Sequence, residues 1–316
     1  MVVTARQIQE ACGDIPFIFR AGVWKPRTRP GTFHGAGAEG LSWLQEVQAS
    51  GIPVATEVAT AEHVRLATAA GIDYLWIGAR TSANPIAVET IAEGCSKTKG
   101  IFIKNPVNAD AGLWLGNIER LEKTGVPVAV IHRGCNHQPC WAMAHKVRQE
   151  RPDIPMLLDP SHLSGKAESV PELMKKIPEL GLDGAMVEVH YRPECALSDA
   201  KQQIKPSDLA EFIGVYRSVA ECIRKDIELN WLRAEIDELD EQLWETIAAR
   251  MDVSRRIGEW KKAQGIAPLQ PERYKEIVER LKTPPSPLCK GEKGLRTEFK
   301  LALWEMIHEE SLRQQE

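Results

Sequence analysis

The chain has 316 residues, of which 43% are hydrophobic, and its formal net charge is −4. This length accommodates a barrel-sized domain and a smaller second one, whereas a slightly acidic chain offers no polycationic surface for nucleic acid or an anionic membrane. No apolar run approaches the roughly 18 residues of a membrane span, and no basic-then-apolar leader opens the chain, so we expect a cytoplasmic protein that binds neither nucleic acid nor membrane.

Residues 17–213 repeat one theme, in which a short apolar run ends in polar or charged residues and an amphipathic stretch follows. The runs are predicted strands at residues 17–19, 53–56, 74–77, 101–103, 128–131, 156–158 and 184–187. Because they are apolar throughout rather than alternating, they predict a parallel sheet covered by helices on both faces. The expected fold class is α/β, a (β/α)₈ barrel of the TIM type. A closed barrel has eight strands and residues 4–12 predict a helix, so we expect the first strand upstream of Met1.

The hydrophobic pattern changes near residue 221, where apolar residues begin to recur every three or four positions. They are Leu229, Leu232, Ile236, Leu239, Leu243, Ile247 and Met251. This stripe predicts one long amphipathic helix over residues 225–263, and helices over 272–282 and 297–315 follow it. Prolines and glycines predict a flexible insert at residues 283–296, between the last two helices.

The two patterns predict two domains, a barrel over residues 1–220 and an all-α three-helix domain over residues 221–316. Three helices of this length cannot bury so long an apolar stripe by themselves. We therefore expect a homodimer that forms through the helical domain.

Five cationic side chains follow the ends of predicted strands. They are Lys25, Arg27, Arg80, Lys104 and Arg133. In a parallel barrel the carboxyl ends of the strands share one face, and cations gathered there repel one another unless an anion lies among them. Arginine suits phosphate and carboxylate oxygens, so the pattern predicts a polyanionic substrate with more than one phosphate. For any single residue, the alternative is a solvated loop charge.

A second group of chemical interest consists of His162, Glu188 and Asp199, which end strands or follow them closely. One histidine and two carboxylates suit a divalent cation such as Mn²⁺, Fe²⁺, Co²⁺ or Zn²⁺. The alternative for His162 is a packed, hydrogen-bonded histidine without a metal.

Seven short segments come in an order that resembles 3-deoxy-D-arabino-heptulosonate 7-phosphate (DAHP) synthases, over residues 4–213. They are KPRT at 25–28, IGAR at 77–80, IKN at 103–105, HRG at 132–134, DPSH at 159–162, VEVH at 187–190 and LSDA at 197–200. The resemblance implies an aldol-type condensation of phosphoenolpyruvate with erythrose 4-phosphate.

The resemblance also implies roles for individual residues. It assigns phosphoenolpyruvate to Lys25, Arg80, Lys104 and Arg133, and the phosphate of the aldehyde to Arg27 and Thr28. It makes His162, Glu188 and Asp199 the metal ligands, and it implies catalytic roles for Lys25, Lys104 and His162.

The chain departs from this family at its start, because the family's first strand ends in Gly-Pro-Cys and that cysteine is a fourth metal ligand. Cys12 lies on the predicted helix that follows, so it does not replace the ligand. One alternative is therefore a barrel without catalytic activity, which acts as a scaffold or regulator of an active helical domain. Another is 3-deoxy-D-manno-octulosonate 8-phosphate synthase, although that family has Lys-Ala-Asn-Arg-Ser where this chain has Lys25-Pro-Arg-Thr.

Residues 226–316 resemble the all-helical chorismate mutases. The resemblance rests on Leu232-Arg233, Ile236-Asp237, Leu239-Asp240, Arg250, Gly258, Lys261, Arg273, Ser311 and Gln315. It implies that Arg250, Arg273 and a partner chain's Arg233 bind the two carboxylates of chorismate. Lys261 and Gln315 then hydrogen-bond the ether oxygen, and Ser311 belongs to the substrate site.

Gln270 and Tyr274 depart from the Asp and Glu that are usual at these two positions in the mutases. The alternative for the whole segment is a plain dimerisation hairpin of helices. Basic residues such as Arg250 and Lys261 beside the apolar stripe favour a substrate site instead. The expected protein is thus a bifunctional enzyme of aromatic amino-acid biosynthesis, with a divalent cation as cofactor.

Overall fold

The structure is a computed structural model that describes residues 1–26, 31, 33–136, 138–222, 226–282 and 295–315. The chain divides into two compact units, Met1–Ile236 and Asp237–Glu316. Two predicted phosphate ligands, Arg27 and Thr28, and residues 283–294 of the predicted insert lie outside the described residues.

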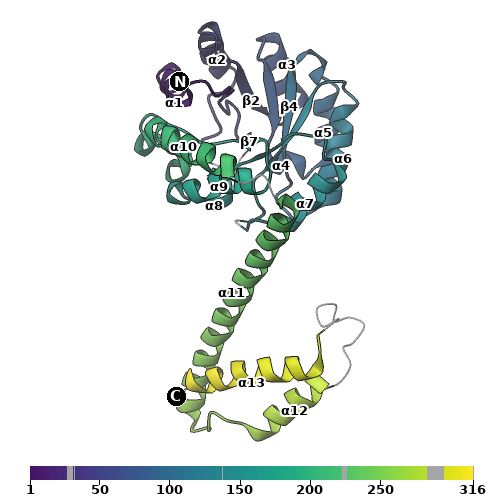
Figure 1. The fold of residues 1–316 in the computed structure, drawn as a ribbon, viewed down its shortest axis with the longest axis vertical. Helices are drawn as coiled ribbons and strands as arrows, with labels where there is room; N and C mark the ends of the chain where they lie inside the picture. The colour runs from purple at the N-terminus through teal and green to yellow at the C-terminus, as the bar shows by residue number, and fades with distance from the viewer. Residues whose placement is uncertain (27–30, 32, 137, 223–225, 283–294, 316) are drawn as a thin grey trace. The chain divides into compact units, whose positions relative to one another are not determined.

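The first unit contains one parallel sheet of seven strands whose spatial order is their order in the chain (Figure 1). The strands are β1 (Phe19–Arg20), β2 (Val54–Val58), β3 (Tyr74–Ile77), β4 (Gly100–Lys104), β5 (Val128–His132), β6 (Met156–Leu158) and β7 (Gly184–Ala185). The sheet is a curled parallel half-barrel, which confirms the predicted TIM-type class. Each neighbouring pair of strands is parallel, so all the carboxyl ends lie on one side of the sheet.

Helices connect successive strands and cover the sheet, because the strands are apolar on both faces. They are α1 (Val2–Cys12), α2 (Glu39–Ala49), α3 (Ala61–Ala69), α4 (Ala79–Ser82), α5 (Pro85–Ala92), α6 (Ala111–Glu122), α7 (Trp141–Glu150), α8 (Pro160–Ser164), α9 (Val170–Glu179) and α10 (Pro206–Cys222). Strand residues such as Leu75, Ile103 and Val130 are completely buried. At the carboxyl ends the buried residues become polar, with Lys104, His132 and Asp159 at most 5% exposed. This change from apolar to polar burial marks the position of a site.

The second unit is helical. It contains most of α11 (Ile227–Gln264), together with α12 (Pro271–Lys282) and α13 (Thr297–Arg313). The bounds agree with the three helices predicted from the sequence to within two residues at each end. Within the described residues, no helix is both long enough and apolar enough to cross a membrane.

The first turns of α11 are packed against the barrel. Trp231 is 1% exposed, stacks on the ring of His145 with centroids 5.3 Å apart, and meets Trp141 edge-on. The two nitrogens of His145 contact carboxylates of α11, Nδ1 at 2.6 Å from Glu235 and Nε2 at 3.0 Å from Glu228. These contacts explain why the compact barrel unit extends to Ile236.

Attachment of residues 227–236 to the barrel is expected to weaken as pH rises. Burial lowers the pKa of His145, but the hydrogen bonds and charges of Glu228 and Glu235 outweigh it, so the net shift is upward. A raised histidine pKa stabilises the folded contact fully below the unfolded pKa of about 6.5, and this contribution is lost as pH rises through the folded pKa. Hydrogen exchange in residues 227–236, corrected for its intrinsic pH dependence, should accelerate a few-fold across that interval.

The control is His145→Phe, which keeps the stacking ring but has no titrating nitrogen. The pH-dependent acceleration should disappear in this variant, and an unchanged acceleration would show that His145 does not cause it.

Candidate active site

A cavity of about 1070 Å³ extends along the sheet, and its lining includes Pro53, Tyr74 and Asp183 at or before the starts of strands as well as Arg20, Glu57 and Lys104 at or near their carboxyl ends. Its wall contains six of the residues that the sequence predicted for the barrel. They are Lys25, Arg80, Lys104, His162, Glu188 and Asp199, the last of them from the loop after β7. Since these residues come from different strand ends, the topology brings them to one cavity rather than to separate surfaces.

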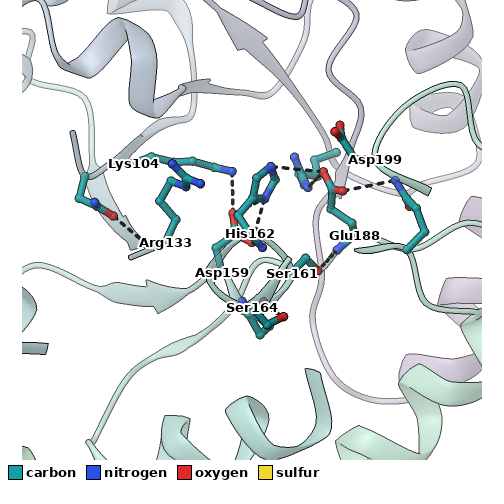
Figure 2. Close-up of polar contacts among 12 residues, drawn as sticks. Lys104, Arg133, Asp159, Ser161, His162, Ser164, Glu188 and Asp199 are labelled. Atoms are coloured by element: carbon teal, nitrogen blue, oxygen red, sulfur yellow. Dashed lines mark hydrogen bonds and ion pairs between the residues drawn. The ribbon is translucent and has the colours of Figure 1, made fainter. Parts of the chain in front are cut away.

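Lys104, the last residue of β4, is 5% exposed and lies against a carboxylate that is completely buried. Its Nζ is 2.6 Å from Asp159 Oδ2 (Figure 2). Burial raises the pKa of Asp159, but the charges of His162 and Lys104 outweigh it and hold that pKa well below its usual range. The pair is therefore ionic, and a buried ion pair of this kind is strongly destabilised when one partner is removed.

His162 lies between two carboxylates, Asp159 and Glu188, as Figure 2 shows. Its Nδ1 is 2.9 Å from Asp159 Oδ2, while Nε2 faces Glu188 Oε1 at 3.8 Å. Asp159 is the N-cap of α8, and its Oδ1 also accepts a hydrogen bond from the backbone N–H of His162. Asp159 thus orients both the helix start and the imidazole ring, which leaves Nε2 directed at Glu188.

The distance between His162 Nε2 and Glu188 Oε1 fits a shared divalent cation. Two ligands that each lie about 2.1 Å from a cation can be up to about 4.2 Å apart, and a carboxylate on the second ring nitrogen is the usual support of a metal-bound histidine. Asp199 is in the same cavity wall but forms an ion pair with Lys25, Nζ to Oδ2 3.3 Å. No group of three or more potential ligands gathers around one point in the described residues, so the structure brings together two of the three predicted ligands.

Of the remaining predicted cations, Arg80 lines the same cavity, whereas Arg133 is not among its lining residues. Arg80 hydrogen-bonds the carbonyl oxygen of Pro26 at 3.3 Å, which places it beside the loop that carries Lys25. Burial lowers the pKa of Arg133, and the charge of Arg80 lowers it further, so the two guanidinium groups lie close enough to repel. Within the described part of the chain, Nε of Arg133 is buried without a hydrogen-bond partner. Such a group is a natural ligand for an anionic oxygen.

Three site residues stand out in the structure although the sequence reasoning assigned them no role. Asp159 pairs with Lys104 and His162, as described above. Arg20 contacts Glu188 Oε1 at 3.1 Å and lies over the ring of Trp76. Glu57 lines the cavity, and burial raises its pKa against the opposing charges of nearby cations. Each ends a predicted strand or follows one, and that position is the signal from which they could have been found.

The helical unit also brings predicted residues together. Arg250 donates to the hydroxyl of Ser311 and, at 3.4 Å, to the carbonyl oxygen of Ile307. Lys261 Nζ donates to Gln315 Oε1 at 3.2 Å. Gly258 permits this approach, since a Cβ there would lie 2.7 Å from the Cα of Gln315.

The other two predicted cations of the helical domain lie elsewhere. Arg273 is exposed and pairs with Glu276 at 2.9 Å on its own helix. Arg233 is exposed on α11, in the part of this helix that belongs to the first compact unit. The structure of one chain therefore brings four of the six predicted mutase residues into hydrogen-bonded pairs.

Fold and site together define a (β/α)-barrel protein with a cationic cavity at its strand ends and an added helical domain. The chain belongs to the DAHP synthetase I family, which matches residues 1–225, and residues 232–316 match chorismate mutase type II.

Individual relatives match either the barrel or the helical part of the chain. Phospho-2-dehydro-3-deoxyheptonate aldolase of Thermotoga maritima is 28% identical over 65% of this chain, which spans 62% of that relative's length. A crystal structure of that aldolase from the same organism superposes with a TM-score of 0.62 at 26% identity, covering 70% of this chain and 65% of the other. The 2-dehydro-3-deoxyphosphooctonate aldolase of Bordetella pertussis is 26% identical over 66% of this chain and 81% of its own length. The 4-amino-4-deoxychorismate mutase of Streptomyces venezuelae is 33% identical over 27% of this chain and 79% of its own length.

Proposed function

We propose that the barrel condenses phosphoenolpyruvate with erythrose 4-phosphate to DAHP, and that the helical domain rearranges chorismate to prephenate, both within aromatic amino-acid biosynthesis. The observation that carries the first activity is the convergence of Lys25, Arg80 and Lys104 on one cavity with His162 and Glu188. Membership of the DAHP synthetase I family supports it. The cytoplasmic location remains a prediction from the sequence.

In the proposed synthase reaction the protein's cations hold two anionic substrates against each other. Lys25, Arg80, Lys104 and Arg133 bind phosphoenolpyruvate, and Arg27 and Thr28 bind the phosphate of the aldehyde. Fixing both substrates offsets their mutual repulsion and removes the entropic cost of their encounter. Glu57 has a raised pKa and lines the cavity, so it can hold a proton close to the reacting atoms.

The family is generally metal-dependent. We propose that His162 and Glu188 hold a divalent cation (Mn²⁺, Fe²⁺, Co²⁺ or Zn²⁺). Asp199, which forms an ion pair with Lys25 in this structure, would be the third ligand. Such a cation polarises the aldehyde carbonyl as a Lewis acid when it is bound. Asp159 holds His162 through Nδ1, so that Nε2 faces Glu188 and is available to the cation.

Removing the cation is expected to abolish the proposed synthase reaction and leave the mutase reaction intact. The full chain is treated with EDTA, dialysed, and assayed for both products before and after Mn²⁺ is added. Synthase activity should fall below about 1% of the Mn²⁺-loaded value, as expected for loss of a Lewis acid worth several kcal/mol, and Mn²⁺ should restore it. Full synthase activity in the metal-free sample would contradict the proposed role of His162 and Glu188.

The proposed mutase reaction needs no nucleophile, because the rearrangement occurs within one molecule. The site has to select the compact conformer of chorismate and stabilise the charge that develops as the ether bond breaks. Arg250, together with Arg273 and the partner subunit's Arg233, is assigned to the carboxylates. Lys261 and Gln315, already hydrogen-bonded to each other, are assigned to the ether oxygen.

A homodimer formed through the helical domain is part of the proposal. The stripe that predicted the long helix is exposed on α11, with Ile236 58%, Leu239 62% and Leu243 45% exposed. Contiguous apolar surface of this kind marks an interface between proteins. Sedimentation of the full chain tests it: a dimer is expected, and Leu239→Glu should shift the equilibrium to monomer.

Two other functions have a specific observation in their favour. The match to 2-dehydro-3-deoxyphosphooctonate aldolases favours arabinose 5-phosphate as the aldehyde substrate. The lack of a three-ligand cluster in the described residues favours a barrel that only supports an active mutase. One assay with Mn²⁺ separates them from the proposal. It measures the consumption of phosphoenolpyruvate in three mixtures, which contain erythrose 4-phosphate, arabinose 5-phosphate or no aldehyde.

A further inference from the structure

A line of side chains on α13 includes one histidine to which neither the sequence nor the family assigns a role. Trp304, His308 and Ser311 recur at intervals of four and three residues, so they lie on one face of the helix, and Gln315 follows one turn later. Arg250 contacts Ile307 and Ser311, immediately before His308 and one turn after it. His308 therefore extends the same row of residues that contains the proposed mutase site.

The ring of His308 is held in one orientation by aromatic contacts. It stacks on Trp304 with centroids 4.8 Å apart and planes 11° from parallel, and Tyr274 of α12 lies at 5.2 Å. His308 and Tyr274 also line a cavity of about 480 Å³ between the two helices, which Arg250, Lys261, Ser311 and Gln315 do not line. Within the described residues, Nε2 of His308 is buried and has no hydrogen-bond partner.

The charges around His308 decide which protonation state it has. Burial lowers its pKa, and the charges of Arg250 and Lys261 lower it further, against an opposing effect of Glu309. The ring is therefore neutral near pH 7. A neutral imidazole offers one donor and one acceptor and no charge, so it suits an uncharged polar group, while Arg250 and Lys261 suit anionic oxygens.

We propose that His308 is a further substrate-binding residue of the helical domain, whose Nε2 hydrogen-bonds the uncharged ring hydroxyl of the dianionic substrate. The inference rests on the proposed mutase function and adds a residue to it. It also accounts for Gln270 and Tyr274, since a site without acidic residues at these positions needs another partner for the hydroxyl group. An unpaired buried nitrogen in the free protein becomes paired when the substrate binds, which favours the substrate that has the hydroxyl.

The test compares the full-length wild type with His308→Phe, which keeps a ring for stacking, and His308→Gln, which keeps a polar group. His308→Phe should lower the mutase kcat/KM for chorismate by about tenfold, the cost of one unpaired polar contact, and His308→Gln should recover to within about threefold of wild type. Synthase activity of the same samples should not change, because it belongs to the other compact unit, and recovery in His308→Gln shows that the helical unit tolerates a change at this position. Equal losses in Phe and Gln variants, or no loss in either, would overturn the proposal.

A second substrate distinguishes a substrate-binding role of His308 from a role in packing alone. 4-Amino-4-deoxychorismate differs from chorismate in having an amine in place of the hydroxyl group that His308 is proposed to contact. The ratio of the two kcat/KM values should change at least about fivefold in His308→Phe, because the contact is specific to one of them. If both substrates slow equally, His308 has only a packing role and the inference is wrong. If the wild type rearranges neither substrate, the proposed mutase function itself fails.

Discussion

Replacing Lys104 with methionine is expected to lower the kcat/KM of the proposed synthase reaction by about 10³-fold or more, the scale of losing a preorganised charge at the reacting centre. Lys104 is the cation buried most deeply in the cavity, and its neighbour Asp159 orients His162. The substitution also leaves Asp159 charged and unpaired in the interior, which should cost about 3–5 kcal/mol of the free energy of unfolding. Steady-state kinetics and denaturant unfolding of the barrel measure the two effects.

The double variant Lys104→Met with Asp159→Asn distinguishes catalysis from folding. It removes both charges, so much of the stability should return, whereas synthase activity should stay low. Lys175→Met is the matched control, since Lys175 forms an exposed pair with Glu172 on α9 and should tolerate the change. Recovery of synthase activity in the double variant would show that Lys104 acts only by stabilising the barrel.

Replacing Arg250 with alanine is expected to lower the mutase kcat/KM by about 10²-fold or more and to leave synthase activity unchanged. Arg250 is half-buried, and burial lowers its pKa, so its charge lies in a partly water-excluded setting where a charge-assisted hydrogen bond to carboxylate is strong. Arg255 is on the same helix but forms an exposed pair with Asp252, so Arg255→Ala should retain mutase activity. If the two variants have equal mutase activity, Arg250 does not bind the substrate.

Much of the fold follows from local sequence patterns. All seven apolar runs form strands, because a strand buried on both faces needs apolar residues at every position. The two end strands are shorter than predicted: β1 is Phe19–Arg20 and β7 is Gly184–Ala185. Each has a hydrogen-bonded neighbour on one side only in the described sheet, so fewer of its residues meet the pairing geometry of a strand.

The site could be predicted less completely, because the partners of a charged residue depend on tertiary contacts. Strand ends identified which cations gather, since parallel topology alone brings them to one face. The sequence did not indicate that Asp159 lies between Lys104 and His162, nor that Lys25 forms an ion pair with Asp199. Both are contacts between different loops whose geometry no spacing rule encodes.

On α11 the sequence pattern predicts the helix but not the residues against which it packs. Its hydrophobic stripe predicted one continuous helix, which the structure confirms as Ile227–Gln264. The same stripe did not indicate that Trp231 is buried against the barrel while Leu239 is exposed. Burial of Trp231 depends on the aromatic rings of α7, more than 80 positions earlier in the chain.

A crystal structure of the full chain with phosphoenolpyruvate and Mn²⁺ tests the central claim most directly. We expect the substrate among Arg80, Lys104 and Arg133, and an anomalous Mn²⁺ peak about 2.2 Å from His162 Nε2 and from a carboxylate oxygen of Glu188. Phosphoenolpyruvate bound away from these three cations, or Mn²⁺ on residues other than His162 and Glu188, would contradict it.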